Sequence, residues 1–157
     1  MRGPVATIEV ARLVRAPVDH VWEVFTDLSA RSQVMSTVDS VELVAGEGFD
    51  VGTTWRETRT LPRAEPVVEE LRVESMEPPR RCLISAHGAD GDYHLDYRFL
   101  PRNGHTQMRV SFSTPLPHKF ATRVLAVLFG EMVTRVIEGG LRHDLDDLAD
   151  AMESAAA

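Results

Sequence analysis

The segment GTTWRETRT carries the side chains best suited to chemistry in this chain. Trp55, Glu57 and Arg59 stand two residues apart, and alternate residues of a β-strand point to the same face. If that face is the interior, Glu57 is a buried carboxylate. Loss of water would raise its pKa, and pairing with Arg59 would lower it. Carboxylates with perturbed pKa values in pockets are candidates for catalysis, so Glu57 and Arg59 are candidate catalytic residues.

Two structural alternatives for Glu57 stay open. The carboxylate can pair with a neighbouring arginine at the end of a strand, which would make its role purely structural. A β-bulge can also turn the side chain toward solvent, because one inserted residue reverses the alternation of faces.

The later strands predict the apolar wall that would surround this segment. DYHLDYRFL, TQMRVSFST and VVEELRVES alternate apolar and polar residues, which indicates one buried and one solvated face. We expect the interior wall to contain Trp55, Leu71, Val73, Tyr93, Leu95, Tyr97, Met108, Val110 and Phe112. The hydroxyls of Tyr93 and Tyr97 can donate to a ligand carbonyl, or both rings can simply fill the core.

A long amphipathic helix is predicted from near His118 to the end of the chain. Apolar residues return every three or four positions at Val133, Ile137, Leu141, Leu145, Leu148 and Met152. Five further residues are expected to face the sheet: Phe120, Val124, Leu128, Met132 and Val136. The carboxylates and the histidine of GGLRHDLDDLAD are expected on a solvated face. A sheet that curls around this helix would bury the stripe and leave space for a ligand.

The order of elements predicts an α+β fold. A first strand over about 5–15 precedes the amphipathic helix of APVDHVWEVFTDL, and Leu28 to Thr37 has room for a second short helix. Six strands follow, the last two joined by a hairpin at Asn103-Gly104, and then the long helix. We expect residues 1–157 to form a single domain, because no linker or repeat divides them.

Composition excludes several classes of protein. The formal net charge of −7 argues against nucleic-acid binding and against electrostatic attachment to anionic lipid. Cys82 is the single cysteine, so no disulfide can form within the chain, and we expect a small buried thiol. The six histidines show no metal-ligand spacing, and we expect neither metal nor cofactor. No signal-peptide pattern is present, and we expect a cytoplasmic monomer or homodimer without stable membrane anchoring.

Several segments in this order resemble the START-like, helix-grip (SRPBCC) superfamily, and within it the polyketide cyclase/dehydrase and lipid-transport group. They are APVDHVWEVFTDL, VDSVELV, GTTWRET, VESMEPPRRC, YRFLPRNGHTQMRVSF and the long helix. The resemblance implies a curved antiparallel sheet of about seven strands around the C-terminal helix, two short helices after the first strand, and a deep apolar cavity. SARSQVMSTV lacks the aromatic-proline element that many relatives carry there, so the shape of the cavity mouth does not carry over.

Three functions are compatible with this resemblance, and whether the chain is an enzyme stays open. The first is binding of a hydrophobic or aromatic small molecule in the cavity, lined by the wall residues together with Phe120, Val124, Leu128 and Met132. The second is a polyketide cyclase/dehydrase-type enzyme, in which Glu57 is the general base and Arg59 with Tyr93 or Tyr97 stabilises the enolate. A protein–protein module of the co-chaperone kind is the third.

Overall fold

The computed structural model describes residues 5–60, 63–89, 91–115 and 120–156. Within these ranges the side chains of residues 5–6, 120–129, 132–133 and 155–156 are outside the description. The elements are β1 (Val5–Val14), α1 (Val18–Phe25), η1 (Leu28–Ala30), α2 (Arg31–Val34), β2 (Val38–Ala45), β3 (Thr54–Arg59), β4 (Val67–Glu77), β5 (Arg81–Gly88), β6 (Gly91–Arg102), β7 (His105–Pro115) and α3 (Phe120–Ala156).

The seven strands form one antiparallel sheet in the order β1-β7-β6-β5-β4-β3-β2. The predicted hairpin joins β6 and β7, and both Asn103 and Gly104 have positive φ angles, of 50° and 82°. A two-residue turn with this geometry matches the twist of the strands on either side. Register shifts at β2 and β4 mark bulges, which bend strands and help the sheet to curve.

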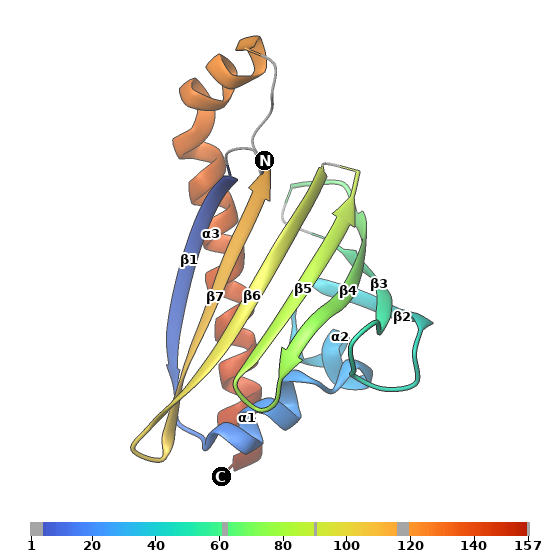
Figure 1. The fold of residues 1–157 in the computed structure, drawn as a ribbon, viewed down its shortest axis with the longest axis vertical. Helices are drawn as coiled ribbons and strands as arrows, with labels where there is room; N and C mark the ends of the chain where they lie inside the picture. The colour runs from blue at the N-terminus through green and yellow to red at the C-terminus, as the bar shows by residue number, and fades with distance from the viewer. Residues whose placement is uncertain (1–4, 61–62, 90, 116–119, 157) are drawn as a thin grey trace.

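The long helix α3 lies along one face of this sheet, and α1 and α2 close the end near its C-terminus (Figure 1). Its predicted stripe is buried at Leu141, Leu145, Leu148 and Met152, while Ile137 is half-buried. These side chains join those of the sheet and of α1 in one apolar core. The predicted α+β helix-grip architecture is therefore confirmed.

One expectation for α3 is wrong, because Val136 does not face the sheet in a buried position and its side chain is 65% exposed. Phe120, Val124, Leu128 and Met132 lie outside the described side chains. Among the helices in the described ranges, we find none with a stretch long and apolar enough to cross a bilayer.

Candidate functional site

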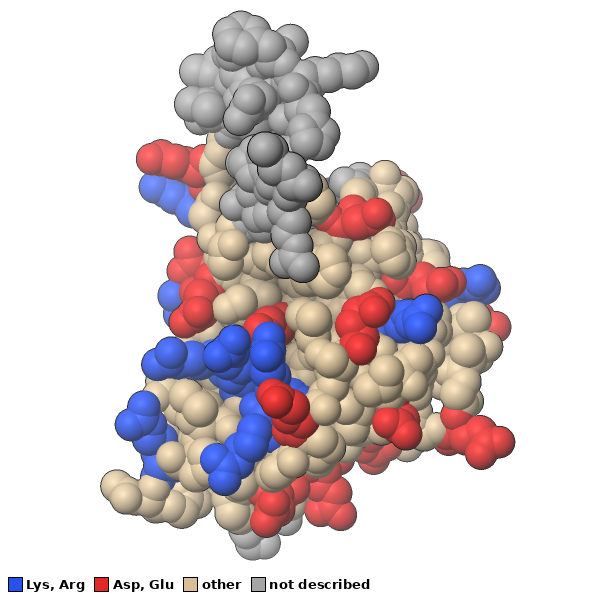
Figure 2. Space-filling model, in the orientation of Figure 1, with Lys and Arg blue, Asp and Glu red and all other residues tan. Residues whose placement is uncertain are grey.

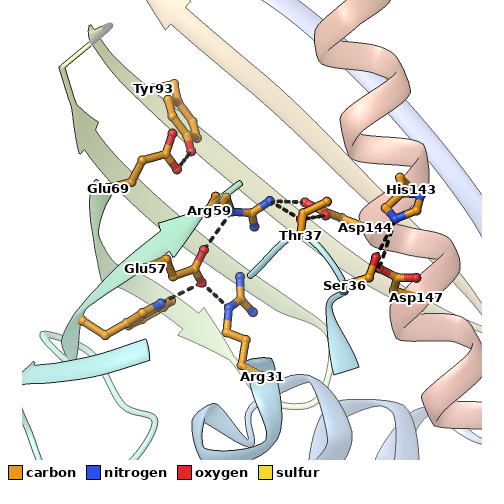
Figure 3. A network of polar contacts seen from close by, with 11 residues as sticks. Arg31, Ser36, Thr37, Glu57, Arg59, Glu69, Tyr93, His143, Asp144 and Asp147 are labelled. Atoms are coloured by element: carbon orange, nitrogen blue, oxygen red, sulfur yellow. Dashed lines mark hydrogen bonds and ion pairs between the residues drawn. The ribbon is translucent and has the colours of Figure 1, made fainter. Parts of the chain in front are cut away.

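Glu57 lies at the centre of a buried ion-pair network (Figure 3). Its side chain has no exposed area, and the inward orientation shared with Trp55 follows the predicted alternation on β3. The indole N–H of Trp55 donates to Oε1 at 2.9 Å, and Nε of Arg59 donates to Oε2 at 3.0 Å. The Nε of Arg31, from α2, also donates to Oε1. The carboxylate thus has three donors, two of them cationic.

The network continues from β3 to α3 through Arg59. Its Nη1 donates to Oδ2 of Asp144 at 3.0 Å and to Oγ1 of Thr37 at 3.2 Å. The hydroxyl of Thr37 in turn donates to Asp144 at 3.3 Å. These contacts tie α2, the residue before β2, β3 and α3 together at one point of the interior.

Thr37 and two charged members of this network were not predicted. Arg31 stands in a stretch with no periodic pattern, and no sequence signal indicated its burial. Asp144 was expected on a solvated face, and this is wrong, since it is only 7% exposed. A signal did exist: Asp144 follows Leu141 by three residues and precedes Leu148 by four, so it shares the buried side of the helix.

The charge of Glu57 is strongly stabilised. Burial by itself would raise its pKa, but Arg31 and Arg59 attract the carboxylate, and the bonds from Trp55 and Arg31 favour its charged form. These effects outweigh burial and lower the pKa of Glu57 to about 2. The carboxylate is therefore ionised at neutral pH and is a very weak base.

One nitrogen of the Arg31 guanidinium makes no hydrogen bond with the described residues. The Arg31 side chain is 3% exposed, and its Nη2 is buried without a hydrogen-bond partner among the described residues. The guanidinium carbon lies 5.7 Å from the centre of the Trp55 ring. Tyr97 is buried close by, and this burial raises the pKa of its hydroxyl to about 12. A buried unpaired donor is costly, so the position favours an oxygen acceptor supplied by water or by a ligand.

The concave face of the sheet changes in character along its length. Near α1, Val14, Tyr97, Phe99 and Met108 are fully buried, and we call these residues the closed half. Toward the start of α3, Ile8, Tyr93 and Phe112 are half-buried, and we call these the open half. Between the two halves, the predicted wall residues Leu71, Val73, Leu95 and Val110 are buried.

The open half carries an aromatic pair with a polar end. The rings of Tyr93 and Phe112 lie 4.9 Å apart, and the hydroxyl of Tyr93 donates to Glu69 of β4. Burial and the neighbouring Glu69 raise the pKa of Tyr93, so the hydroxyl remains a donor. Figure 3 shows Tyr93 and Glu69 above Arg59, on the same side of the sheet as the network.

On α3, the residues one and two turns before Asp144 are Gly140 and Val136, and both are exposed. A Cβ atom at Gly140 would meet no atom within 4 Å. Solvent therefore reaches this side of α3, next to the buried network.

A second polar cluster joins Ser36, His143 and Asp147 (Figure 3). The hydroxyl of Ser36 lies 2.7 Å from Nε2 of His143 and donates to Asp147 at 2.8 Å. The carboxylate of Asp147 approaches this same Nε2, at 3.5 Å, and among the described residues no polar contact to Nδ1 orients the ring. This is not the order of a nucleophile, base and orienting acid, and the cluster fastens α3 to the segment before β2.

Two further groups bear on chemistry. Cys82 is buried, as predicted, and this burial raises the pKa of its thiol to about 12, which keeps the thiol protonated at neutral pH. Within the part of the chain that the structure describes, no group of three or more His, Cys, Asp or Glu side chains is placed to hold a metal ion.

A pocket among the described residues lies elsewhere, beside β2. It has a volume of about 370 Å³ and is bounded by the turn after α1, β2 and the β2–β3 loop. It is not the predicted cavity between the sheet and α3, which involves side chains outside the description.

The fold and the sequence together place the chain in a known family. The model of the polyketide cyclase/dehydrase and lipid transport family matches residues 5–153, and the chain belongs to this family. A search of curated proteins found no match.

Solved structures share the fold at low sequence identity. The Zhui aromatase/cyclase from a Streptomyces species superposes with a TM-score of 0.73 at 18% identity, covering 96% of this chain and 94% of that one. A truncated norcoclaurine synthase from Thalictrum flavum gives 0.71 at 13%, covering 96% and 95%. A Staphylococcus aureus protein of unknown function gives 0.77 at 14%, covering 97% and 96%. At these identities the likeness shows the fold alone.

Proposed function

We propose that this protein binds a hydrophobic or aromatic small molecule between the open half of the concave face and α3. The observation that carries the proposal is the loss of burial along a single apolar wall. Three inward side chains are only half-buried, although the next inward residues on the same strands are buried: Ile8, Tyr93 and Phe112. Large apolar side chains left accessible on a concave surface are typical of ligand sites. The family description, which includes lipid transport, supports the same function.

The polar network gives such a site a polar end. Arg59 is half-buried at the boundary of the two halves, and the free Nη2 of Arg31 lies deeper. Both are cationic donors, and the hydroxyls of Tyr93 and Tyr97 come from β6 of the same sheet. A ligand with an apolar body and a carbonyl or hydroxyl oxygen at one end would match this distribution.

We propose Glu57 as a positioning residue for the two arginines. A general base in a cyclase-type reaction needs a pKa near the working pH, whereas that of Glu57 is about 2. Both carboxylate oxygens are also occupied by donors. The geometry therefore supports ligand binding rather than proton abstraction by Glu57. The similarity to the Streptomyces aromatase/cyclase concerns the fold and not the reaction.

Native mass spectrometry of the freshly purified protein, followed by extraction, tests the proposal directly. We expect a co-purified small molecule, or otherwise a rise in melting temperature with 2-acetylnaphthalene, since a ligand that binds only the folded state stabilises it. An empty protein whose melting temperature no apolar probe changes would refute the function.

Two glycine variants locate the site. Gly140→Phe would place a ring in the open space beside Asp144, and we expect it to weaken binding of 2-acetylnaphthalene at least about tenfold. Gly139→Phe is the matched control, because Gly139 is also exposed but precedes Gly140 by one residue and points about 100° away around the helix. Equal binding by both variants would place the ligand elsewhere.

The polar end is tested with a matched pair of probes. 2-Isopropylnaphthalene has nearly the shape of 2-acetylnaphthalene but lacks its oxygen. We expect the ketone to bind more tightly, by about fivefold to tenfold for a charge-assisted hydrogen bond. Equal affinities for the two probes would show that the site recognises only the apolar body, and that the arginines do not contact the ligand.

A further inference from the structure

The pocket beside β2 has an apolar interior. Leu28, Val41, Leu43 and Phe49 line it, together with Thr26 and Ser29 from the turn after α1. The Phe49 ring lies 5.8 Å from Phe25 and 5.9 Å from Trp55, so it forms an inner wall toward the core. Leu43 remains 48% exposed although it belongs to the concave side of the sheet. A volume of about 370 Å³ is within the range of sites for small ligands.

The loop that forms the outer wall is held in place. Thr53 is buried, and its hydroxyl donates to the carbonyl of Gly48 at 2.7 Å and accepts from the amide of Asp50 at 3.1 Å. Gly46 has a φ of +97°, and a Cβ there would lie 2.8 Å from the Thr53 hydroxyl. Only glycine suits this close approach. The pocket is therefore formed before any ligand arrives, which reduces the entropic cost of binding.

The rim of the pocket is acidic. Asp27 and Glu47 both line it and are exposed. Asp27 accepts hydrogen bonds from the amide and the hydroxyl of Ser29, and neither carboxylate pairs with an arginine or lysine of the described residues. In Figure 1 the β2–β3 loop lies at the lower right of the molecule. In Figure 2, which has the same orientation, the charged side chains in this region are acidic. An apolar pocket with this rim is complementary to a cationic amphiphile.

We propose that this pocket is a second binding site, separate from the space between the sheet and α3, for a small aromatic or apolar molecule that carries an ammonium group. The apolar body lies against Phe49, Leu28 and Val41. The ammonium group lies at the rim, beside Glu47 and Asp27. An aromatic body would also gain from an offset or edge-to-face contact with the Phe49 ring.

A titration of ¹⁵N-labelled protein tests the site and its chemistry together. The probe is 1-naphthylmethylamine, and its neutral counterpart is 1-naphthylmethanol. We expect amide shifts centred on Gly48 and Phe49, with the amine bound about threefold more tightly than the alcohol, which is the effect of an exposed ion pair. The preference should fade at about 0.5 M salt, where such pairs are screened.

Four variants complete the test. Gly48→Phe fills the pocket, because a Cβ there meets no atom within 4 Å, and binding should fall at least about tenfold. Glu47→Gln should remove the preference for the amine, while Glu42→Gln, an exposed acid on the same strand as Leu43, should retain it. Leu43→Gln, at a side chain already half-exposed, should also weaken binding if Gly48→Phe fails to fold.

Several outcomes would overturn the proposal. Shifts centred on Tyr93 and Phe112 would assign the probe to the other site. Equal affinity for amine and alcohol in the unmodified protein would remove the charge preference. Unchanged binding by Gly48→Phe and Leu43→Gln would show that the pocket is not occupied.

Discussion

The closed and open halves of the concave face are built from the same strands with the same alternation, yet only one is sealed. The closed half is covered by aromatic side chains of α1: Phe25 lies 4.7 Å from Tyr97 and 5.0 Å from Phe99, and Trp22 lies 5.8 Å from Phe99. The open half has no aromatic partner from α1 among the described residues. The strands thus provide one continuous apolar wall, and the short helix decides which part becomes core.

The buried ion pairs lie where the two halves meet, and they give the largest expected effect. Glu57→Gln leaves Arg31 and Arg59 with one anion fewer in a buried setting, and we expect a loss of about 3–5 kcal/mol in the free energy of unfolding. Denaturation in urea measures it. Glu70→Gln is the control, because its pair with Arg56 is exposed and should be worth about 1 kcal/mol or less. Similar losses would contradict the role of the network.

Truncating one ring in each half compares the halves directly. Phe99→Ala removes a fully buried side chain, and we expect a cost of about 3–5 kcal/mol in stability. Phe112→Ala removes a half-buried ring and should cost about half as much or less, because less apolar area is returned to water. If Phe112→Ala proved as costly as Phe99→Ala, the open half would be core.

Acid should act first on the ion-pair network between the two halves. The pKa of Glu57 is about 2 in the folded protein, below its ordinary value of 4.5. The stabilisation is therefore fully present above about pH 5 and is lost as the pH falls toward 2, in total about 3 kcal/mol for this shift. Stability measured between pH 5 and 2 should fall more steeply for the unmodified protein than for Glu57→Gln. Parallel slopes would show that other carboxylates dominate.

The smallest expected change in stability is at Gly140 of α3, on the side of the open half. Gly140→Ala adds a methyl group in open space within a helix, and we expect a gain of about 1 kcal/mol in stability from helix propensity. The melting temperature should rise by a few degrees while binding of 2-acetylnaphthalene is kept. A loss of stability would mean that the space beside Gly140 is filled.

Periodic patterns predicted the fold and the wall, because burial of alternate residues on strands and of a stripe on α3 is a local property of the sequence. The inward orientation of Glu57 followed from its spacing to Trp55. The partners of Glu57 and Arg59 could not be predicted in this way, because Arg31 and Asp144 contact β3 only through tertiary packing. Asp144 is also one of several carboxylates in its segment, and the pattern did not distinguish it from the others. The pocket beside β2 was unpredictable for the same reason: it exists because a loop, a turn and a strand edge enclose it.

The ion-pair network also bears on the order in which the chain is synthesised. Arg31 and Glu57 are 26 residues apart, but Arg59 meets Asp144 across 85 residues, and α3 is the last element of the fold. Before α3 has been synthesised, Glu57 is the one carboxylate of the network available to Arg31 and Arg59, because Asp144 belongs to α3. We therefore expect docking of α3 and neutralisation of the interior to occur together, after the sheet has been synthesised, as the step that completes the core.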